Sequence, residues 1–511
     1  MSAVRHGTDA SCFKEGAFVK SIAKYIDAFC AECPENKVNA IPDSASLAFL
    51  EENLPLIEIP DKQMEETYYF RAWTYRKHIK KTEDGYIVTE FLPDVPWAGV
   101  DNAISCPVAH HIAEGRHFKN KGFLYDYIRH FAMGRGSEKD IYSYSNPFID
   151  EVCRFVLAEG DLAFGRELYP HLCRQYEKLK ELHGTTSGLY FSYDNKDGME
   201  YSISGPGLRP TFNSYMYADA MSLAALADAL GDGEMAEELR AEAGTLRSLV
   251  HRYLYDAKDG FYKTVPAADK DADPDFDRSD PDHDCREEIG YVPFLYGLSE
   301  KEEEGAFRLL FDETCFAAPY GPTTADRSHP RFMKCTVKHE CLWDGPSWPY
   351  ATSQTLSAME KILHDGTDAV TREEYMSLLS TFSRSHTLTE GGRTIPFIDE
   401  DLDPFTGEWI ARDRIVEMKK EGIDKIEGRG MYYNHSTFCD LVLSGAFGIS
   451  VKDDTLTVDP LAIGTWKTFS VENLTVRGRT FAIAYDGKAL SLSEGGRVIA
   501  AGERKLSYSL L

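Results

Sequence analysis

The chain has 511 residues, of which 43% are hydrophobic and 12% aromatic, a composition that supports a large core and excludes a mainly disordered chain. Against 56 lysines and arginines stand 83 aspartates and glutamates, so the formal net charge is −27. A field of this sign repels phosphate, which excludes nucleic acids and anionic membrane surfaces as favoured partners and suits a neutral or modestly acidic small substrate.

The distribution of apolar and cysteine residues predicts a cytoplasmic protein. The first residues lack a basic region followed by an apolar run, and no stretch approaches the roughly 18 apolar residues of a membrane span. The chain has 11 cysteines, an odd number without framework spacing, which is typical of reduced thiols. We interpret the pair Cys30 and Cys33 as structural thiols within a helix rather than as a metal or redox site.

Taken in chain order, the hydrophobic pattern predicts a hairpin and then paired helices. Residues 83–92 read as a strand or hairpin, and 146–184, 214–255 and 347–386 each read as two amphipathic helices. The last pair, in 434–449, is only half visible. The three complete pairs are interrupted by turns that contain glycine, at 159–161, 231–233 and 365–366.

Acidic and aromatic loops between paired helices favour a closed helical toroid whose loops gather at one mouth. From about residue 451 the pattern changes to short alternating segments, which predict a small β-rich appendage. We therefore expect a mainly α fold with a catalytic domain over 1–450, including a helical lead-in over 1–60, and a β appendage over 451–511.

Four regions combine acids, aromatics and turn residues in a way that a helical core does not require. The first is 68–73 together with FLPDVPWAGVDN (91–102), and the second is DGMEYSI (197–203). The third is WDGPSWPY (343–350), and the fourth is IDEDLDPFTGE (398–408) with GRGMYYNHSTFCD (428–440). These regions are the candidates for the functional site.

The third region resembles the W-x-G-P-x-W signature of inverting glycoside hydrolases with an (α/α)6 barrel, including family 63 α-glucosidases and bacterial mannosylglycerate hydrolases. The order of the second, third and fourth regions is also similar to that of these enzymes. The resemblance covers about residues 60–445. It implies an (α/α)6 barrel and an inverting exo-glycosidase that acts on a small α-glucoside or α-mannoside without a cofactor.

The resemblance also implies the two catalytic carboxylates. Glu200 falls where the family motif, similar to S-G-x-D-N-S-P, places its general acid, although the family residue is Asp. Glu400 falls where a motif similar to E-N-Y-x-P-x-T-G places the general base. Inverting glycoside hydrolysis requires such a pair, one carboxyl protonated and one ionised, about 6.5–9.5 Å apart.

Each assignment has a structural alternative. Glu200 needs a pKa raised by burial beside Tyr190 and its neighbours, or it only fixes its loop. Glu400 stands among other acids, so the alternative is a solvated acidic turn. The carboxylates that could replace one of the two are Asp197, Asp344 and Asp401.

Aromatic and polar residues of the same regions are predicted to bind the sugar. Tryptophan and tyrosine rings stack on pyranose C–H faces, with core packing as the alternative, and arginine binds acidic groups or pairs with barrel acids. Asp344, between Trp343 and a rigid Gly-Pro turn, is expected to accept hydrogen bonds from hydroxyls or to cap the next helix. The predicted substrate-binding residues are Trp343, Asp344, Trp348, Trp97, Asp94, Tyr190, Arg209, Tyr433 and His435.

The histidines leave other functions open. His110 and His111 are adjacent and project in different directions, and no HExxH spacing occurs, so we predict no catalytic metal. The alternatives to a hydrolase are an epimerase or isomerase on the same barrel, with His435 and His110 or His111 exchanging protons, a phosphorylase, and a carbohydrate-binding barrel without catalysis. The sequence does not decide the sugar, the aglycone, the anomer or the oligomeric state.

Overall fold

The computed structural model describes residues 15–33, 35, 37, 39–136 and 138–511. The predicted helix pairs form, with breaks where glycine was expected. At the first break Gly160 has φ 70°, a left-handed conformation that costs glycine little. The pairs are α7 (Phe148–Glu159) with α8 (Leu162–His183), α9 (Pro210–Leu230) with α10 (Gly233–Leu254), and α12 (Pro349–His364) with α13 (Arg372–Ser385).

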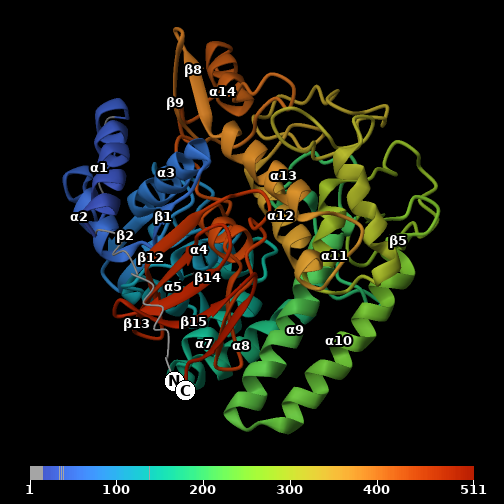
Figure 1. Ribbon diagram of the computed structural model, residues 1–511. Coiled ribbons are helices and arrows are strands. Elements are labelled where there is room, and N and C mark those ends of the chain that lie inside the picture. Colours follow the sequence, from blue (N-terminus) through green and yellow to red (C-terminus); the bar gives the residue numbers. More distant parts are fainter. Residues whose placement is uncertain (1–14, 34, 36, 38, 137) are drawn as a thin grey trace, which may run out of the picture.

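The helices pack as an inner and an outer ring, and α9 of the inner ring lies beside α10 of the outer ring in Figure 1. Successive members of the inner ring pack on one another, and α4 is buried along its whole length, as expected of a helix enclosed on every side. This arrangement confirms the (α/α)6 toroid. The inner ring is α4 (Val108–Gly115), α7, α9, α11 (Val292–Leu295), α12 and η5 (Leu441–Ala446), and the outer ring is α3 (Lys62–His78), α5 (Gly122–Ala132), α8, α10, η4 (Lys301–Phe311) and α13.

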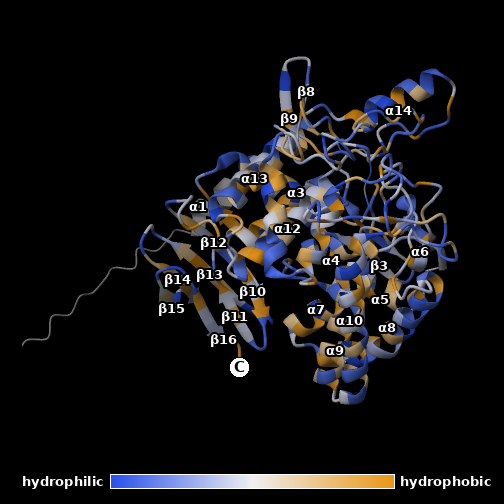
Figure 2. Cartoon of the chain, turned by 90° about the vertical axis from the view of Figure 1, so that its right-hand side faces the viewer, coloured by the Kyte–Doolittle hydropathy of each residue, from blue (hydrophilic) through white to orange (hydrophobic). Residues whose placement is uncertain are grey.

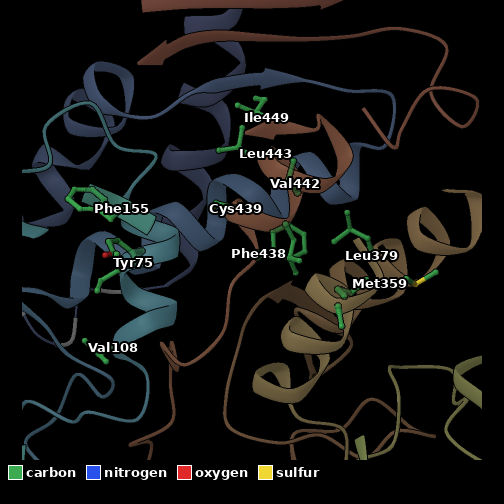
Figure 3. Packing of buried hydrophobic residues seen from close by; sticks show 14 of the residues in the cluster. Tyr75, Val108, Phe155, Met359, Leu379, Phe438, Cys439, Val442, Leu443 and Ile449 are labelled. Atoms are coloured by element: carbon green, nitrogen blue, oxygen red, sulfur yellow. The ribbon is translucent and has the colours of Figure 1, made fainter. Parts of the chain in front are cut away.

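The ring closes where the segment before η5 meets the end of α4. Asp440 accepts hydrogen bonds from Arg116 Nη2 at 2.7 Å and pairs with His117 Nε2 at 2.6 Å. Phe438 is fully buried, and in Figure 3 its ring lies toward Met359 and Leu379. The helix that the sequence showed only in part is therefore a single π-helical turn held by buried ion pairs and apolar packing.

The C-terminal strands form two sheets beside the rings (Figure 2). In the larger sheet β1 of the lead-in pairs antiparallel with β12, with Ile57 opposite Val471. The division at residue 450 stays a prediction, because the lead-in contributes a strand to the appendage. The sheets are β1 (Leu56–Glu58), β12 (Phe469–Val476), β13 (Arg479–Tyr485), β14 (Leu490–Glu494) and β15 (Arg497–Gly502), and β10 (Ile449–Lys452), β11 (Thr455–Val458) and β16 (Leu506–Ser509).

Loops and short elements gather at one end of the toroid. The strand or hairpin predicted over 83–92 is a hairpin that begins earlier in the chain, formed by β2 (Ile79–Thr82) and β3 (Gly85–Val88). A second hairpin, β8 (Thr387–Glu390) with β9 (Arg393–Pro396), and α14 (Ile410–Lys420) lie at the top of Figure 1, opposite the α9–α10 turn. The sequence analysis missed both. Residues 269–285 contain neither helix nor strand.

The remaining elements are short or belong to the lead-in. No helix in the described ranges is both long and apolar enough to cross a bilayer. Every described cysteine is a free thiol, and Cys12 lies outside the described residues. The remaining short and lead-in elements are α1 (Glu15–Glu32), α2 (Asp43–Asn53), α6 (Glu138–Tyr142), η1 (Val100–Asn102), η2 (Asp194–Lys196), η3 (Glu288–Tyr291), β4 (Gly207–Leu208), β5 (Tyr255–Asp256), β6 (Phe261–Tyr262) and β7 (Val265–Pro266).

Ring closure gives a stability prediction. Phe438→Ala removes a fully buried ring that packs on Phe382 and His386 at the end of α13, so we expect the free energy of unfolding to fall by about 3–5 kcal/mol. Thermal unfolding measures the change, with Phe276→Ala as the matched control because Phe276 is 37% exposed. Equal shifts for the two variants would contradict the closing role of Phe438.

Candidate active site

Each candidate region contributes a loop that precedes an inner helix, and these loops meet at one end of the toroid; residues 68–73 instead lie within α3, and 398–408 precede α14. Residues 91–102 lead into α4, 197–203 into α9, 343–348 into α12, and 428–440 into η5. Proline is the first residue of both α9 and α12, where its fixed φ favours helix initiation and its missing N–H has no cost. The helix starts are thus defined locally, and the loops before them converge.

The loop that carries Glu200 is fixed by a buried ion pair. Asp197 accepts a hydrogen bond from Arg209 Nε at 2.8 Å, and both side chains are fully buried. Arg209 Nη1 also donates to the carbonyl oxygen of Gly205 at 2.6 Å. Next to Glu200, Tyr201 adopts a left-handed φ of 61°, and its N–H donates to Asp194 Oδ2 at 3.0 Å. Arg209 and Asp197 therefore hold the loop and leave Glu200 to face the site.

The Glu200 carboxyl is half-buried and electrostatically destabilised as an anion. Burial raises its pKa to about 8, the negative charges of Glu400 and Glu90 add to the effect, and Arg429 opposes it. The carbonyl oxygen of Glu200 accepts a hydrogen bond from Trp343 N at 3.1 Å, which joins this loop to the 343–350 region. At pH 7 Glu200 is therefore mainly protonated.

Glu400, by contrast, is bound by an arginine. It is buried, and its two oxygens accept a bidentate pair from Arg429, with Nε–Oε2 at 3.1 Å and Nη2–Oε1 at 2.9 Å. Cys341 Sγ donates to Oε1 at 3.4 Å, and Arg429 Nη1 also pairs with Glu340 at 2.5 Å. This is the geometry of an ionised carboxylate held in one orientation.

The acidic turn around Glu400 is buried, so the solvated-turn alternative is wrong. Asp399 and Asp401 are 2% and 0% exposed, and burial raises their pKa values to about 7 and about 8. Asp401 pairs with Arg414 at 2.9 Å, and Asp399 accepts the backbone N–H of Glu400 at 2.9 Å. Both are engaged in holding the turn, and Glu400 alone faces Arg429.

The candidate tryptophans differ in burial: Trp343 and Trp348 are buried, whereas Trp97 is half-buried. Trp343 and Trp348 stack on each other with ring centroids 4.4 Å apart, and each is 2% exposed. Trp348 Nε1 donates to the carbonyl oxygen of Leu342 at 3.0 Å. The two rings therefore form a wall, and the expectation of two open stacking platforms is wrong. Trp97 is half-buried, and the Arg429 guanidinium lies 4.7 Å from its ring centroid.

Sequence reasoning missed Glu90, which lies at the centre of a buried polar cluster. Glu90 Oε1 accepts from the Tyr433 hydroxyl at 2.9 Å and pairs with His435 Nδ1 at 2.9 Å. The expected residues Tyr433 and His435 do join the site, through this carboxylate. The available signal was an acid next to an apolar run, in VTEFL (88–92), which a solvent-exposed strand does not require.

Other predicted residues lie outside the site or serve its loops. Asp94 is 75% exposed and pairs with Lys37 on the surface. Asp344 is buried, and its Oδ2 accepts the backbone N–H of Cys335 at 2.7 Å, so it shapes a loop. Tyr190 packs on Phe212, where burial raises its pKa to about 12. The expected binding roles of Asp94, Asp344, Tyr190 and Arg209 are corrected by these contacts.

The comparisons with known proteins agree with this geometry. The family model described as Mannosylglycerate hydrolase MGH1-like glycoside hydrolase domain matches residues 100–436. The chain belongs to this family. The match spans Glu200, Glu400 and Arg429, and the domain is thus a glycoside hydrolase domain of a family that acts on carbohydrate. A search of curated proteins found no significant match.

Solved structures support the same fold. A chain described as a sialidase is 32% identical, with a TM-score of 0.85, over 96% of this chain and 44% of that chain. This protein therefore spans less than half the length of that relative. A GH78 rhamnosidase of a Bacillus species is 14% identical with a TM-score of 0.54, over 86% of this chain and 41% of that chain. A GH63 mannosylglycerate hydrolase from Thermus thermophilus, with Tris and D-glycerate, is 14% identical with a TM-score of 0.50, over 74% and 99%.

The raised pKa of Glu200 gives a second prediction. Its pKa rises from an ordinary value near 4.5 to about 8 on folding, so folding favours the protonated form. The native state therefore loses stability as the pH rises from about 4.5 to 8, and Glu200→Gln, which does not titrate, escapes this loss. The melting temperature of Glu200→Gln minus that of the wild type should grow across this interval and stay constant above it.

The matched control is Glu238→Gln, an exposed glutamate on α10. Differential scanning fluorimetry from pH 4 to 9 measures both differences. A Glu200→Gln difference that does not change with pH would show that Glu200 titrates as an ordinary surface carboxyl.

Proposed function

We propose that this domain is an inverting exo-glycosidase for a small α-glycoside, of the α-glucoside or α-mannoside type, with Glu200 as general acid and Glu400 as general base. The observation that carries the proposal is the opposite charge state of two neighbouring carboxyls. Glu200 is kept protonated by burial and by the charge on Glu400, whereas Glu400 is clamped by Arg429. This division is what acid–base hydrolysis of a glycoside requires.

In this mechanism the Glu200 carboxyl donates its proton to the glycosidic oxygen as the bond to the anomeric carbon breaks. Glu400 removes a proton from a water molecule, whose oxygen attacks the anomeric carbon from the opposite face. The products are the free aglycone alcohol and a sugar of inverted configuration. Glu200 ends ionised and Glu400 protonated, and exchange with solvent restores both.

Arg429 has a specific part in this cycle. It holds both oxygens of Glu400, and it retains Glu340 as a partner when Glu400 gains its proton. The guanidinium therefore does not become an unpaired buried charge at any step, which would be costly. The pair supports a base that is oriented before the substrate binds.

A second candidate is the sugar epimerase. The rings of His110 and His435 lie 5.6 Å apart and both are buried, which is the facing pair that such an enzyme would use. His111 is not available, because its nitrogens pair with the Tyr127 hydroxyl at 2.8 Å and the Asn434 carbonyl oxygen at 2.5 Å. The free thiols of the described residues support a reducing, cytoplasmic setting for either enzyme.

The stereochemical course tests the proposal. Proton NMR of the protein with α- and β-linked disaccharides and glycosyl glycerates should show sugar released first as the inverted anomer. Glu200→Gln and Glu400→Gln should each lower kcat by about 10²–10⁴, since each removes a proton-transfer group. The control Glu421→Gln, at an exposed carboxylate paired with Lys338, should keep full activity. Retained configuration would contradict the mechanism, and an isomerised sugar without cleavage would favour the histidine pair.

The acid and the base can be separated by the leaving group and by pH. A dinitrophenyl glycoside leaves without protonation, so Glu200→Gln should lose much less activity on it than on a disaccharide, while Glu400→Gln should lose as much on both. Wild-type kcat/KM on the disaccharide should fall about tenfold per pH unit above about pH 8, as Glu200 ionises. Steady-state rates at each pH measure this, and a limb that persists in Glu200→Gln would exclude Glu200 as its source.

A further inference from the structure

One carboxylate oxygen of Glu90 accepts two hydrogen bonds, and the other accepts none from the described residues. The side chain is 95% buried, since its exposed fraction is 5%, and Oε1 takes the hydrogen bonds of both Tyr433 and His435. No hydrogen bond from another described residue reaches Oε2. The acid is also close to the proposed reaction centre, because its charge contributes to the raised pKa of Glu200. Glu90 therefore presents a fixed, unused acceptor at the site.

Three ring nitrogens around Tyr350 are buried without a hydrogen-bond partner among the described residues: His435 Nε2, His110 Nδ1 and Trp343 Nε1. The ring centroids lie 4.1 Å (His435), 5.1 Å (His110) and 5.8 Å (Trp343) from that of Tyr350, so the three rings belong to one cluster, and His435 joins this cluster to Glu90. A buried polar atom without a partner is costly, and native proteins normally satisfy such atoms with a ligand or water.

The donor and acceptor pattern of this cluster fits hydroxyl groups. When His435 Nδ1 donates its proton to Glu90, Nε2 is left as an acceptor, whereas Trp343 Nε1 can only donate. Glu90 Oε2 is a second acceptor. A sugar hydroxyl donates one hydrogen bond and accepts others, so adjacent hydroxyls of a pyranose complement two acceptors and a donor.

The charges around the cluster oppose an acidic sugar. The negative charges of Glu90 and Glu400 both raise the pKa of Glu200, and the Arg429 guanidinium is already paired with Glu400 and Glu340. Arg209, which the sequence predicted to bind substrate, is paired with Asp197. A sugar carboxylate at this position would meet Glu90 without a free cation, which would cost binding energy.

We propose that Glu90, His435 Nε2 and Trp343 Nε1 form the sugar-recognition end of the site, where Glu90 binds the hydroxyls of an uncharged sugar and excludes sugars that carry a carboxylate. The inference rests on the proposed function for the location of the reacting carbon. It adds a specificity-determining residue that lies outside the span matched by the family model, which begins at residue 100.

Binding to the Glu200→Gln protein tests the inference separately from hydrolysis. Isothermal titration calorimetry would use methyl α-D-mannoside, methyl α-D-glucoside, methyl α-D-glucuronide and N-acetylneuraminic acid as probes. At least one neutral glycoside should bind, and the two acidic sugars should bind at least tenfold more weakly. Introducing Glu90→Gln as a second substitution should weaken binding of the neutral sugar about tenfold or more. It should also reduce the ratio between the affinities for the neutral and the acidic sugars. Glu421→Gln is the matched control.

Deoxy sugars separate recognition from folding. A glycoside lacking the hydroxyl that Glu90 binds should lose affinity for the protein with Glu90, and should lose nothing further when Glu90 is changed to Gln. A merely structural Glu90 would weaken all sugars equally. Equal affinity of the neutral sugar with and without Glu90→Gln, tight binding of either acidic sugar, or no binding of any neutral glycoside would overturn the inference. Failure of the inverting mechanism alone, with these binding results intact, would overturn only the proposed function.

Discussion

The bidentate ion pair between Arg429 and Glu400 is the interaction on which the rest of the site depends. A buried carboxylate is stable as an anion only when a cation and hydrogen bonds compensate for lost water, and Arg429 supplies both. The same guanidinium binds Glu340, so it joins the 340–348 and 398–435 segments. Burial, and to a lesser extent the nearby Glu400 carboxylate, push Glu200 toward its protonated form. Arg429 thus contributes to the different charge states of the two glutamates.

The toroid supplies the rigidity that this charge arrangement needs. Loops that precede successive inner helices converge at one end, and buried side chains fix them at their bases. The Asp197–Arg209 pair holds the Glu200 loop. The contacts of Asp440 with Arg116 and His117 close the ring. Neither pair faces the substrate. Their contribution is to place the reacting carboxyls on elements that do not move independently.

The sequence predicted the features that are encoded locally. Glycine turns located the helix breaks, the alternating pattern located the C-terminal strands, and the order of short motifs located Glu200 and Glu400. Contacts that form only in the tertiary structure were not predictable in this way. Arg209 was expected to bind substrate, but it pairs with Asp197, and nothing in the sequence indicated that β1 would join β12. Trp343 and Trp348 read as platforms until their stacking was visible.

Glu90 shows why the site was only partly visible from sequence. A single acid at the end of a strand carries no spacing signal, and its role depends on Tyr433 and His435, which approach it from the other end of the chain. The family resemblance indicated Glu200 and Glu400, the two carboxylates of the proposed mechanism. Recognition of the sugar depends on unpaired donors and acceptors that only three-dimensional structure reveals.

The most direct measurement is a crystal structure of the Glu200→Gln protein with a bound α-glycoside. The account predicts that the anomeric carbon lies between residue 200 and Glu400, with about 6.5–9.5 Å between the two side-chain carbonyl groups and a water molecule on Glu400. It also predicts that Arg429 still holds Glu400 in the complex. A separation of about 5–5.5 Å, the distance of retaining enzymes, or a sugar bound away from this pair would contradict it.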